Sequence, residues 1–316
     1  MKAYLGIDVG SVSINIVVLS EAGEVITGLY LRTMGRPVQV IQEGLRQAAE
    51  YIPPDIEIAG VGSTGSGRYL AGVMVGADVV KNEITAHAVA ASMIEPDVQT
   101  VFEIGGQDSK IIILRNGIVT DFAMNTVCAA GTGSFLDQQA ARLDIPITQF
   151  GDLALQSCQP VRIAGRCTVF AESDMIHKQQ MGHQIPDIIN GLCEALVRNY
   201  LNNVGKGKEV LPPILFQGGV AANIGIKAAF EKALGKPVLI PKHYDIMGAI
   251  GAAQLAREEV GNGATKFKGF KITGLPYRTG SFECDGCSNV CEIVEIYEED
   301  KVIGRWGSRC SKWDII

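Results

Sequence analysis

Cysteine is the residue type in this chain that is most open to metal or redox chemistry, and the 316 residues include eight of them. Cys128 ends a strand-like run and is followed by a Gly-Thr-Gly turn and a segment, 134–143, with apolar residues at helical spacing. This pattern predicts Cys128 at or just before a helix N-terminus, where free N–H groups and the helix dipole favour an anion. A thiolate and a thiolate-ligated iron–sulfur cluster are both such anions. A small buried cysteine beside a tight turn fits the pattern equally well.

The other cysteines lie in different settings. Cys158 and Cys167 flank a short irregular segment, and no role is assigned to Cys158, whereas Cys193 lies inside an amphipathic helical pattern and is expected in the core. The last segment carries four more cysteines, on two loops. Four such thiols suit tetrahedral Zn²⁺ or an iron–sulfur cluster, and so small a segment needs a metal to fold. The sequence therefore predicts a metal-organised tail with the ligands Cys284, Cys287, Cys291 and Cys310.

Two acidic, glycine-rich turns recur with similar surroundings. Asp8 opens an Asp-Val-Gly-Ser turn between two strand-like runs, and Glu103 opens a second such turn that includes Gln107 and Asp108. Successive N–H groups in turns of this kind bind phosphate oxygens, and a carboxylate at the lip holds Mg²⁺ through water. One copy is a weak signal. Two copies predict two similar halves that share one phosphate group.

Two further glycine-rich turns are candidates for nucleotide contacts. A strand followed by Gln217-Gly218-Gly219 and a helix allows a flat ring to approach the backbone closely. The loop 62–68 has the glycine spacing of a P-loop, but Arg68 and Tyr69 stand where Lys and Ser/Thr belong. We therefore do not expect this loop to bind phosphate as a P-loop does.

The composition limits the function classes. Twenty-eight Lys and Arg against thirty-four Asp and Glu give a net charge of −6, which argues against wide binding to a nucleic-acid backbone. No apolar run is long enough to span a membrane, and the N-terminus lacks a signal-peptide core before Asp8. A soluble, cytoplasmic protein is expected. In that compartment cysteines indicate metal or redox chemistry more than disulfides.

The elements that must position these residues alternate between strand and helix patterns, which predicts an α/β fold. Helices are expected at 38–51, 82–93, 134–143, 168–181, 186–204, 223–234 and 246–259. Strands are expected at 2–9, 13–19, 25–31, 56–62, 101–104, 110–114, 118–123, 213–216, 238–240, 293–297 and 302–306. The turns described above fall between these elements.

Seven motifs, in order along residues 3–258, resemble the activators of 2-hydroxyacyl-CoA dehydratases and the related ATPase components of benzoyl-CoA reductases. They are GIDVGSVS, STGSGR, NEITAHA, EIGGQDSK, NTVCAAGTGSF, GRCTVFAESD and QGGVAAN. The resemblance implies an actin-like ATPase of the actin, sugar-kinase and heat-shock-chaperone superfamily, with two similar mixed-sheet domains around a nucleotide cleft. It places the first domain at 1–95 with 245–261, the second at 96–244, and a small Cys-rich subdomain at 262–316.

The resemblance also implies a function, namely an ATP-hydrolysing one-electron donor. In the family one [4Fe–4S] cluster bridges a homodimer, and its ligands align with Cys128 and Cys167 of each subunit. Because a cubane needs four thiolates, a two-fold axis supplies the other two. The implied partners are an acceptor iron–sulfur dehydratase or reductase and an upstream ferredoxin or flavodoxin.

The nucleotide site follows from the same motifs. The resemblance implies that Asp8 and Glu103 place Mg²⁺ and that Gln107 or Asp108 orients the attacking water, with no choice between those two. The residues implied to contact ATP are Gly10, Ser11, Val12, Ser13, Gly105, Gly106, Gln107, Gly131, Gly133, Gln217, Gly218 and Gly219.

Three other functions stay open on the sequence. The chain could serve a double-cubane cluster reductase in place of a dehydratase. It could be an actin-like small-molecule kinase with incidental cysteines, although no substrate-base motif supports this. It could also be a redox sensor that binds nucleotide without turnover. The acyl-CoA substrate of the acceptor enzyme leaves no trace in this chain.

Overall fold

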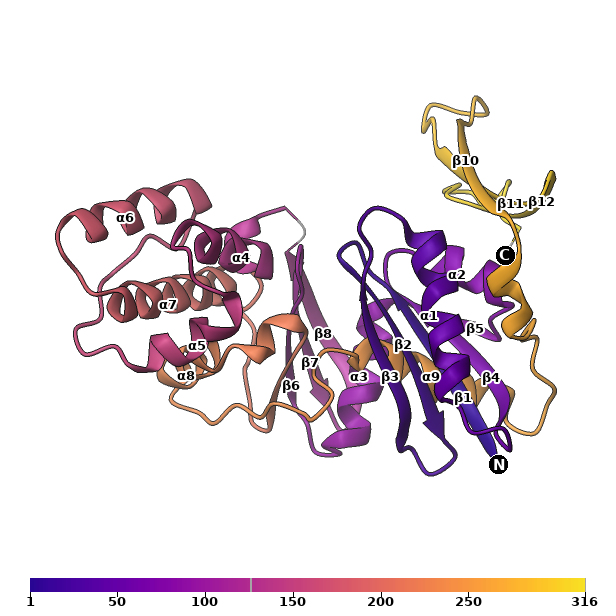
Figure 1. Cartoon of the computed structure of the whole chain (residues 1–316), viewed down its shortest axis with the longest axis horizontal. Helices are drawn as coiled ribbons and strands as arrows, with labels where there is room; N and C mark the ends of the chain where they lie inside the picture. The colour runs from indigo at the N-terminus through magenta and orange to yellow at the C-terminus, as the bar shows by residue number, and fades with distance from the viewer. Residues whose placement is uncertain (126, 316) are drawn as a thin grey trace. The chain divides into compact units, whose positions relative to one another are not determined.

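The structure is a computed structural model that describes residues 1–125 and 127–315. The chain forms two compact units, the first made of Met1–Ala90 and Gly248–Ile316 and the second of Ala91–Met247 (Figure 1). Each unit has its own mixed sheet covered by helices. Within the described residues no helix is both long and apolar enough to cross a bilayer.

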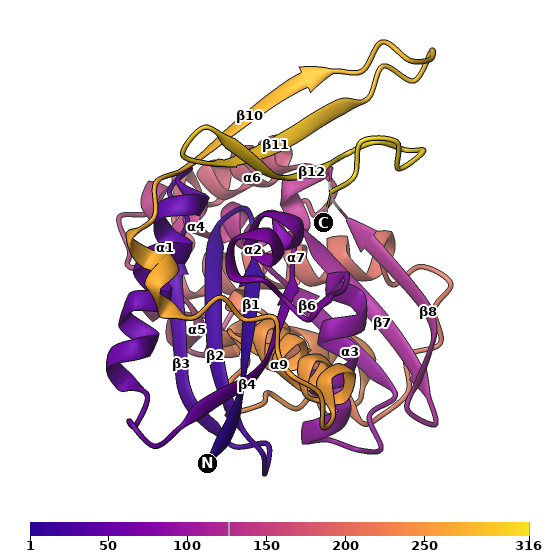
Figure 2. The same cartoon turned by 90° about the vertical axis from the view of Figure 1, so that its right-hand side faces the viewer.

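The sheet of unit 1 is a three-stranded antiparallel meander extended by parallel strands, in the order β3-β2-β1-β4-β5 (Figure 2). Its strands are β1 (Lys2–Val9), β2 (Ser13–Ser20), β3 (Val25–Arg32), β4 (Glu57–Thr64) and β5 (Val79–Val80). The helices of this unit include α1 (Pro37–Tyr51), α2 (Arg68–Val75) and most of α3 (Glu83–Ile94) and α9 (Met247–Val260), whose ends cross the boundary with unit 2. In α1 the buried residues Ile41, Leu45 and Ala48 recur at helical spacing, so one apolar stripe packs on the sheet.

The sheet of unit 2 repeats the same arrangement, in the order β8-β7-β6-β9, with β9 parallel to β6. Its strands are β6 (Thr100–Ile104), β7 (Ser109–Arg115), β8 (Ile118–Asn125) and β9 (Ile214–Gln217). Its helices are α4 (Gly133–Arg142), α5 (Ile147–Leu155), α6 (Thr168–Gln180), α7 (Ile185–Asn203) and α8 (Ile224–Leu234), with short 3₁₀ turns η1 (Ala129–Gly131) and η2 (Gly219–Ala222). The repetition expected from the two acidic turns is thus present in both sheets.

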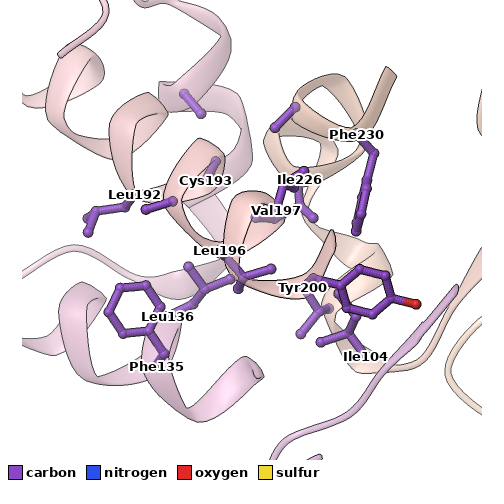
Figure 3. Packing of buried hydrophobic residues seen from close by; sticks show 14 of the residues in the cluster. Ile104, Phe135, Leu136, Leu192, Cys193, Leu196, Val197, Tyr200, Ile226 and Phe230 are labelled. Carbon is purple, nitrogen blue, oxygen red and sulfur yellow. The ribbon is translucent and has the colours of Figure 1, made fainter. Parts of the chain in front are cut away.

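The core of unit 2 is built around α7 (Figure 3). Tyr200 meets Phe230 edge to face at 5.3 Å between ring centroids, and Phe102 lies 4.8 Å from Phe230. The hydroxyl of Tyr200 donates to the carbonyl oxygen of Lys110 at 2.7 Å, which satisfies its one polar atom. Cys193 is fully buried in this core, as its helical position predicted.

Several elements differ from the expectations. Helices α2 and α5 were not predicted, and neither was strand β10 (Tyr277–Glu283). The strand expected at 238–240 is reduced to one bridge between Leu215 and Leu239. Pro237 and Pro241 flank that segment and have no N–H to donate, so a longer ladder cannot form.

The tail forms a three-stranded antiparallel sheet of β10, β11 (Glu292–Glu298) and β12 (Lys301–Trp306), preceded by the 3₁₀ turn η3 (Phe270–Gly274) (Figure 2). Ile272 and Ile296 are fully buried in the same core cluster as β1 and α1. The Gln42 side chain of α1 donates to the carbonyl oxygens of Ile272 and Leu275, at 3.1 and 2.8 Å. The tail therefore packs on the core of unit 1, and the metal expected at its four cysteines stays a prediction.

Candidate functional site

Asp8 stands at the end of β1, beside the turn at residues 10–13. The turn is closed by the Gly10 N–H, which donates to the Ser13 carbonyl oxygen at 2.9 Å. The Thr33 hydroxyl donates to the Gly10 carbonyl oxygen at 3.2 Å, which ties the turn to the end of β3. Ser11, in the middle of the turn, is exposed. The predicted phosphate turn of unit 1 is therefore held by its own backbone and has an exposed tip.

Two glycines pack closely against the Asp8 carboxylate. A Cβ atom at Gly65 would lie 2.4 Å from Asp8 Oδ1, and one at Gly248 would lie 2.1 Å from Oδ2. Gly65 also has φ +89°, a conformation that glycine adopts without strain. The position of Asp8 thus depends on residues far away in the sequence.

The loop at 62–68 is not arranged as a phosphate cradle. The Gly67 N–H and the Ser66 hydroxyl both donate to the Val9 carbonyl oxygen, at 2.8 and 3.2 Å. The loop then leads directly into α2. Its groups hold the end of β1 beside Asp8, which agrees with the expectation that it is not a P-loop.

In unit 2, Glu103 lies directly opposite Lys110 in the β6–β7 hairpin. Lys110 Nζ is 2.9 Å from Glu103 Oε2 and 2.9 Å from Asp108 Oδ1, although the lysine side chain is only 2 % exposed. Burial raises the pKa of Glu103, and the charge of Lys110 opposes that shift. One buried cation therefore joins the two acidic residues of the predicted turn.

Sequence reasoning missed Lys110 as a site residue. The signal was present, because a single lysine opens the otherwise apolar run Lys110–Leu114. A buried lysine needs a carboxylate partner, and the hairpin register places Glu103 opposite it. Gln107, by contrast, is exposed, and the Gly105 N–H donates to the Asp108 carbonyl oxygen at 3.0 Å to close the turn.

The turn after Glu103 is bonded to the start of α4. The Gly133 N–H donates to the Gly105 carbonyl oxygen and the Ser134 N–H to the Gly106 carbonyl oxygen, both at 2.9 Å. Gly131 is buried just before this contact. The turn is thus hydrogen-bonded directly to the N-terminus of α4.

The third predicted turn lies beside the same hairpin. Gln217 ends β9 opposite Glu103, and it is fully buried. Gly218 has φ +88°, and a Cβ atom there would lie 2.7 Å from Glu103 Oε1. Gly219 follows and is exposed. The structure thus gathers the predicted residues into two sets, each within one unit: Asp8, Gly10, Ser11, Val12 and Ser13 in unit 1, and Glu103, Gly105, Gly106, Gln107, Asp108, Gly131, Gly133, Gln217, Gly218 and Gly219 in unit 2.

Cys128 and Cys167 lie on one face of unit 2, although thirty-nine positions separate them in the sequence. Cys128 Sγ is 3.9 Å from the carbonyl oxygen of Arg166, the residue before Cys167. The Asn199 side-chain amide links the two segments, because it donates to the Gly165 carbonyl oxygen at 2.6 Å and lies 3.9 Å from Cys128 Sγ. Both cysteines are half-buried and free.

The helix-end position predicted for Cys128 belongs more fully to Cys167. Cys167 is the N-cap of the thirteen-residue helix α6, whereas Cys128 caps only the 3₁₀ turn η1 ahead of α4. The favourable dipole for an anion is therefore strongest at Cys167. Cys128 is held instead by Asn125, whose side chain accepts from the Cys128 N–H at 3.0 Å and donates to its carbonyl oxygen at 2.8 Å.

Exposed apolar side chains lie close to each of the two cysteines in the sequence. Val127 is 95 % exposed, and Val169 and Phe170 are each 66 % exposed. Phe170 and Cys167 also line a cavity of about 640 Å³ together with residues of the 162–166 segment and α6. Exposed apolar side chains that lie near one another mark an interaction surface more often than singly exposed apolar side chains do.

The remaining cysteines differ in environment. Burial raises the pKa of Cys193 to about 12, so this thiol stays protonated. In the tail, Cys284 and Cys291 meet at the end of the β10–β11 hairpin, where the Cys284 N–H donates to the Cys291 carbonyl oxygen at 2.8 Å. The Gly286 N–H and the Trp313 indole donate to Cys284 Sγ and lower its pKa. Cys287 and Cys310 are exposed. Among residues 1–125 and 127–315, no three His, Cys, Asp or Glu side chains are grouped so as to hold a metal ion, so the tail thiols as placed do not form a metal site.

Two acidic glycine-rich turns on two sheets of like topology define an actin-like α/β ATPase fold. Two solved structures share it: the activator of the 2-hydroxyisocaproyl-CoA dehydratase from Clostridium difficile with bound ADPNP, and component A of the (R)-2-hydroxyglutaryl-CoA dehydratase from Acidaminococcus fermentans. The first has a TM-score of 0.73 and 30% identity over 81% of this chain and 95% of its own. The second has a TM-score of 0.74 and 34% identity over 82% and 99%.

The chain belongs to the BadF/BadG/BcrA/BcrD ATPase family, whose model matches residues 5–256. It is 37% identical, over 81% of its length and 98% of the relative's, to the (R)-2-hydroxyglutaryl-CoA dehydratase activating ATPase of Acidaminococcus fermentans. The chain is thus an ATP-binding ATPase, and the family resemblance and fold class expected from its motifs are confirmed. The match of the family model ends before the Cys-rich tail.

Proposed function

We propose that this protein is an ATP-hydrolysing one-electron donor that reduces a partner iron–sulfur enzyme of the 2-hydroxyacyl-CoA dehydratase or benzoyl-CoA reductase type. The observation that carries the proposal is that Cys128 Sγ lies 3.9 Å from the carbonyl oxygen of Arg166, the residue before Cys167, in a member of this ATPase family. Relatives that bear the names of dehydratase activators support the choice of acceptor.

The two thiols fit a [4Fe–4S] cluster that two copies of the chain share. One chain offers two cysteines at this face, and the described residues contain no third ligand grouped with them. A cubane takes four thiolates, so a second copy related by a two-fold axis completes the set. Such a cluster would supply one-electron redox chemistry. Cys167 favours its negative charge through the α6 N-terminus, and Asn199 supports Cys128.

The same face supplies the contact between the two copies. Val127, Val169 and Phe170 lose their exposure to water when a second copy covers them, which favours association by the hydrophobic effect. Because an isologous contact uses each patch twice, both pairs of cysteines come to the axis together.

The nucleotide turns take the following roles. Asp8 would hold Mg²⁺, and the N–H groups at 10–13 and at 105–107 would bind phosphate oxygens. Gly218 and Gly219 allow the adenosine to approach the backbone. Lys110 pairs with both Glu103 and Asp108 and thereby holds the Asp108 carboxylate in place. Because that carboxylate is paired and Gln107 is exposed, Gln107 orients the attacking water.

The coupling between ATP and the cysteines runs through α4. The phosphate turn at 105–106 is hydrogen-bonded to Gly133 and Ser134, and Cys128 lies five residues before Gly133. Movement of the turn on hydrolysis therefore changes the surroundings of Cys128. This path gates electron transfer to the acceptor by the state of the nucleotide, with a ferredoxin or flavodoxin as the source of electrons.

The test is ATP-dependent reduction of an acceptor dehydratase by the anoxically purified protein. Wild type should reduce the acceptor only while it hydrolyses MgATP. Cys128→Ser should keep hydrolysis, since the phosphate turns are intact, and lose all reduction. Reduction by Cys128→Ser at the wild-type rate, or no reduction by wild type, would refute the proposal.

We propose separately that a zinc ion or a second iron–sulfur cluster binds the tail at Cys284, Cys287, Cys291 and Cys310. Binding has to draw the two exposed thiols toward Cys284, whose lowered pKa favours the thiolate that a metal requires. Zinc and iron content of the Cys287→Ser/Cys310→Ser variant is compared with wild type. Equal metal content in both proteins contradicts a tail site. This variant is preferable to truncation near Glu259, which would strip Ile272 and Ile296 from the core of unit 1.

A further inference from the structure

A second cavity, of about 630 Å³, lies next to the cysteine pair and carries a different chemistry. It opens between the 162–166 segment and the C-terminal half of α7. Its lining contains four cationic side chains and three amides and has neither a carboxylate nor an aromatic ring: Arg162, Gly165, Arg166, Arg198, Asn199, Asn202, Asn203 and Lys206. We call this cavity the basic cleft.

The positive charge of the basic cleft is largely uncompensated. Arg162, Arg166 and Lys206 are exposed and make no ion pair within the part of the chain that the structure describes. Arg198 is the exception, with Glu194 at 3.7 Å and a hydrogen bond to the Ile163 carbonyl oxygen. In a chain whose net charge is −6, such a concentration of cations needs a reason.

The basic cleft shares its wall with the cysteine face. Asn199 lines the cleft and lies 3.9 Å from Cys128 Sγ. Arg166 lines it too, and its carbonyl oxygen is 3.9 Å from the same sulfur, while Cys167 is the next residue. A partner seated in the cleft is therefore held close to both thiols.

We propose that the basic cleft docks the small acidic protein that delivers the electron, so that it is the entry side for reduction. The inference rests on the proposed function. The step moves one electron from the reduced carrier to the oxidised cluster, and no bond forms or breaks. Cations spread over both walls steer an acidic surface into contact and set its orientation.

The lining favours a protein over a small ligand. No aromatic or apolar side chain is present to stack against the base of a nucleotide or coenzyme. Two of the amides, Asn202 and Asn203, are exposed and can hydrogen-bond a partner without charge, which suits the polar rim of a transient contact. Asn199 is buried and is already bonded to Gly165 and Asn203. Inorganic phosphate is the remaining small candidate, and the experiment separates it from the carrier.

The test reverses two cations of the cleft, Arg162→Glu and Lys206→Glu, in one variant. Neither residue is assigned to the cluster or to ATP, and Arg198 is spared because it bonds to the backbone. The matched control is Lys2→Glu with Lys301→Glu, two exposed lysines of unit 1 that give the same change in net charge. Binding of an oxidised acidic ferredoxin to the anoxic holoprotein is measured at several salt concentrations, together with the rate of cluster reduction by the reduced ferredoxin.

The cleft variant should bind the ferredoxin at least about tenfold more weakly and lose most of its salt dependence, whereas the control should stay within about twofold of wild type. Reduced methyl viologen, a small cation that needs no docking site, should reduce the cluster of both variants at the wild-type rate or faster. Ferredoxin affinity and reduction rate within twofold of wild type in the cleft variant would overturn the inference. So would phosphate binding that the variant abolishes without any change toward ferredoxin. A wild-type protein with no iron, or one that viologen cannot reduce, would instead overturn the proposed function and this inference with it.

Discussion

Lys110 shows how one buried cation can hold an acidic turn in shape. It is almost wholly buried, and its ammonium group is 2.9 Å from carboxylate oxygens of both Glu103 and Asp108. Removing one partner of a buried ion pair leaves the other charge buried and uncompensated. The resulting loss of folding free energy is larger than the stabilisation that the pair itself provides. The turn beneath the predicted phosphate site therefore depends on this lysine.

Substitution of Lys110 by Met tests this role at the residue scale. Lys110→Met should lower the free energy of unfolding by about 3–5 kcal/mol, because Glu103 remains buried without its partner. The matched control is Lys227→Met, which breaks a half-exposed pair with Glu231 and should cost less than about 1 kcal/mol. Urea denaturation measures both. A loss of stability in Lys110→Met no larger than in the control would show that the buried pair does not hold the turn.

At the scale of elements, the packing of α9 and of the loop before α2 against Asp8 depends on glycine. Gly65→Ala places a methyl group 2.4 Å from Asp8 Oδ1 and should weaken MgATP binding by at least about tenfold, because the carboxylate must move. Gly35 is the matched control, since it has φ +70° and no atom within 4 Å of its Cβ position. Gly35→Ala should cost only backbone strain, about 1 kcal/mol, and leave ATP binding unchanged. Calorimetric titration with MgATP measures both, and equal affinities in the two variants contradict the account.

The start of α7 (Ile185–Asn203) predicts a pH dependence. Asp187 Oδ1 accepts hydrogen bonds from Ser157 Oγ and from the N–H groups of Cys158 and Gln159, at 2.8 to 2.9 Å. These bonds, with that from Gln159 foremost, hold the pKa of Asp187 below its ordinary value. Because the pKa is lower in the folded state than in the unfolded state, the stabilisation is present above the unfolded pKa, about 3.9, and is lost as pH falls through the folded one.

Replacement of Asp187 by Asn should remove that dependence. The wild-type thermal midpoint should fall more steeply than that of Asp187→Asn between about pH 5 and pH 3, because only the wild type must protonate a bonded carboxylate. The exposed Asp300→Asn, which has no hydrogen bond among those described in the structure and only a long contact to Arg278, is the control and should keep the wild-type slope. Identical slopes for all three proteins would mean that Asp187 carries no such linkage.

At the scale of the whole molecule, much of the site was predictable, because its residues lie in short local motifs. The turns at Asp8 and Glu103 and the core position of Cys193 follow from patterns of a few residues each. The adjacency of Cys128 and Cys167 is a tertiary fact that local periodicity cannot give, and only the family resemblance indicated it. Lys110 was missed because its pairing with Glu103 comes from the hairpin register, which a local sequence pattern does not show.

The structure of the tail could be predicted only in part from the sequence. β11 and β12 have alternating apolar residues and were predicted, but β10 exposes most of its side chains and gave no such signal. The metal was inferred from the small size of the segment, which took no account of packing on unit 1 through Ile272 and Ile296. A size argument is therefore incomplete for a segment that packs on a neighbouring core, and metal binding by the tail stays a prediction that depends on its four thiols.

The central claim is that two chains share one cluster through Cys128 and Cys167. Iron content and native mass of anoxically purified protein test it most directly, with Cys167→Ser as the variant and Cys158→Ser and Cys193→Ser as controls. Wild type and both controls should be dimers with the same iron content, which includes about four atoms per pair of chains at the shared cluster. Cys167→Ser should lack that iron and shift toward the monomer. A Cys167→Ser protein that keeps the wild-type iron content and remains a dimer would contradict the account.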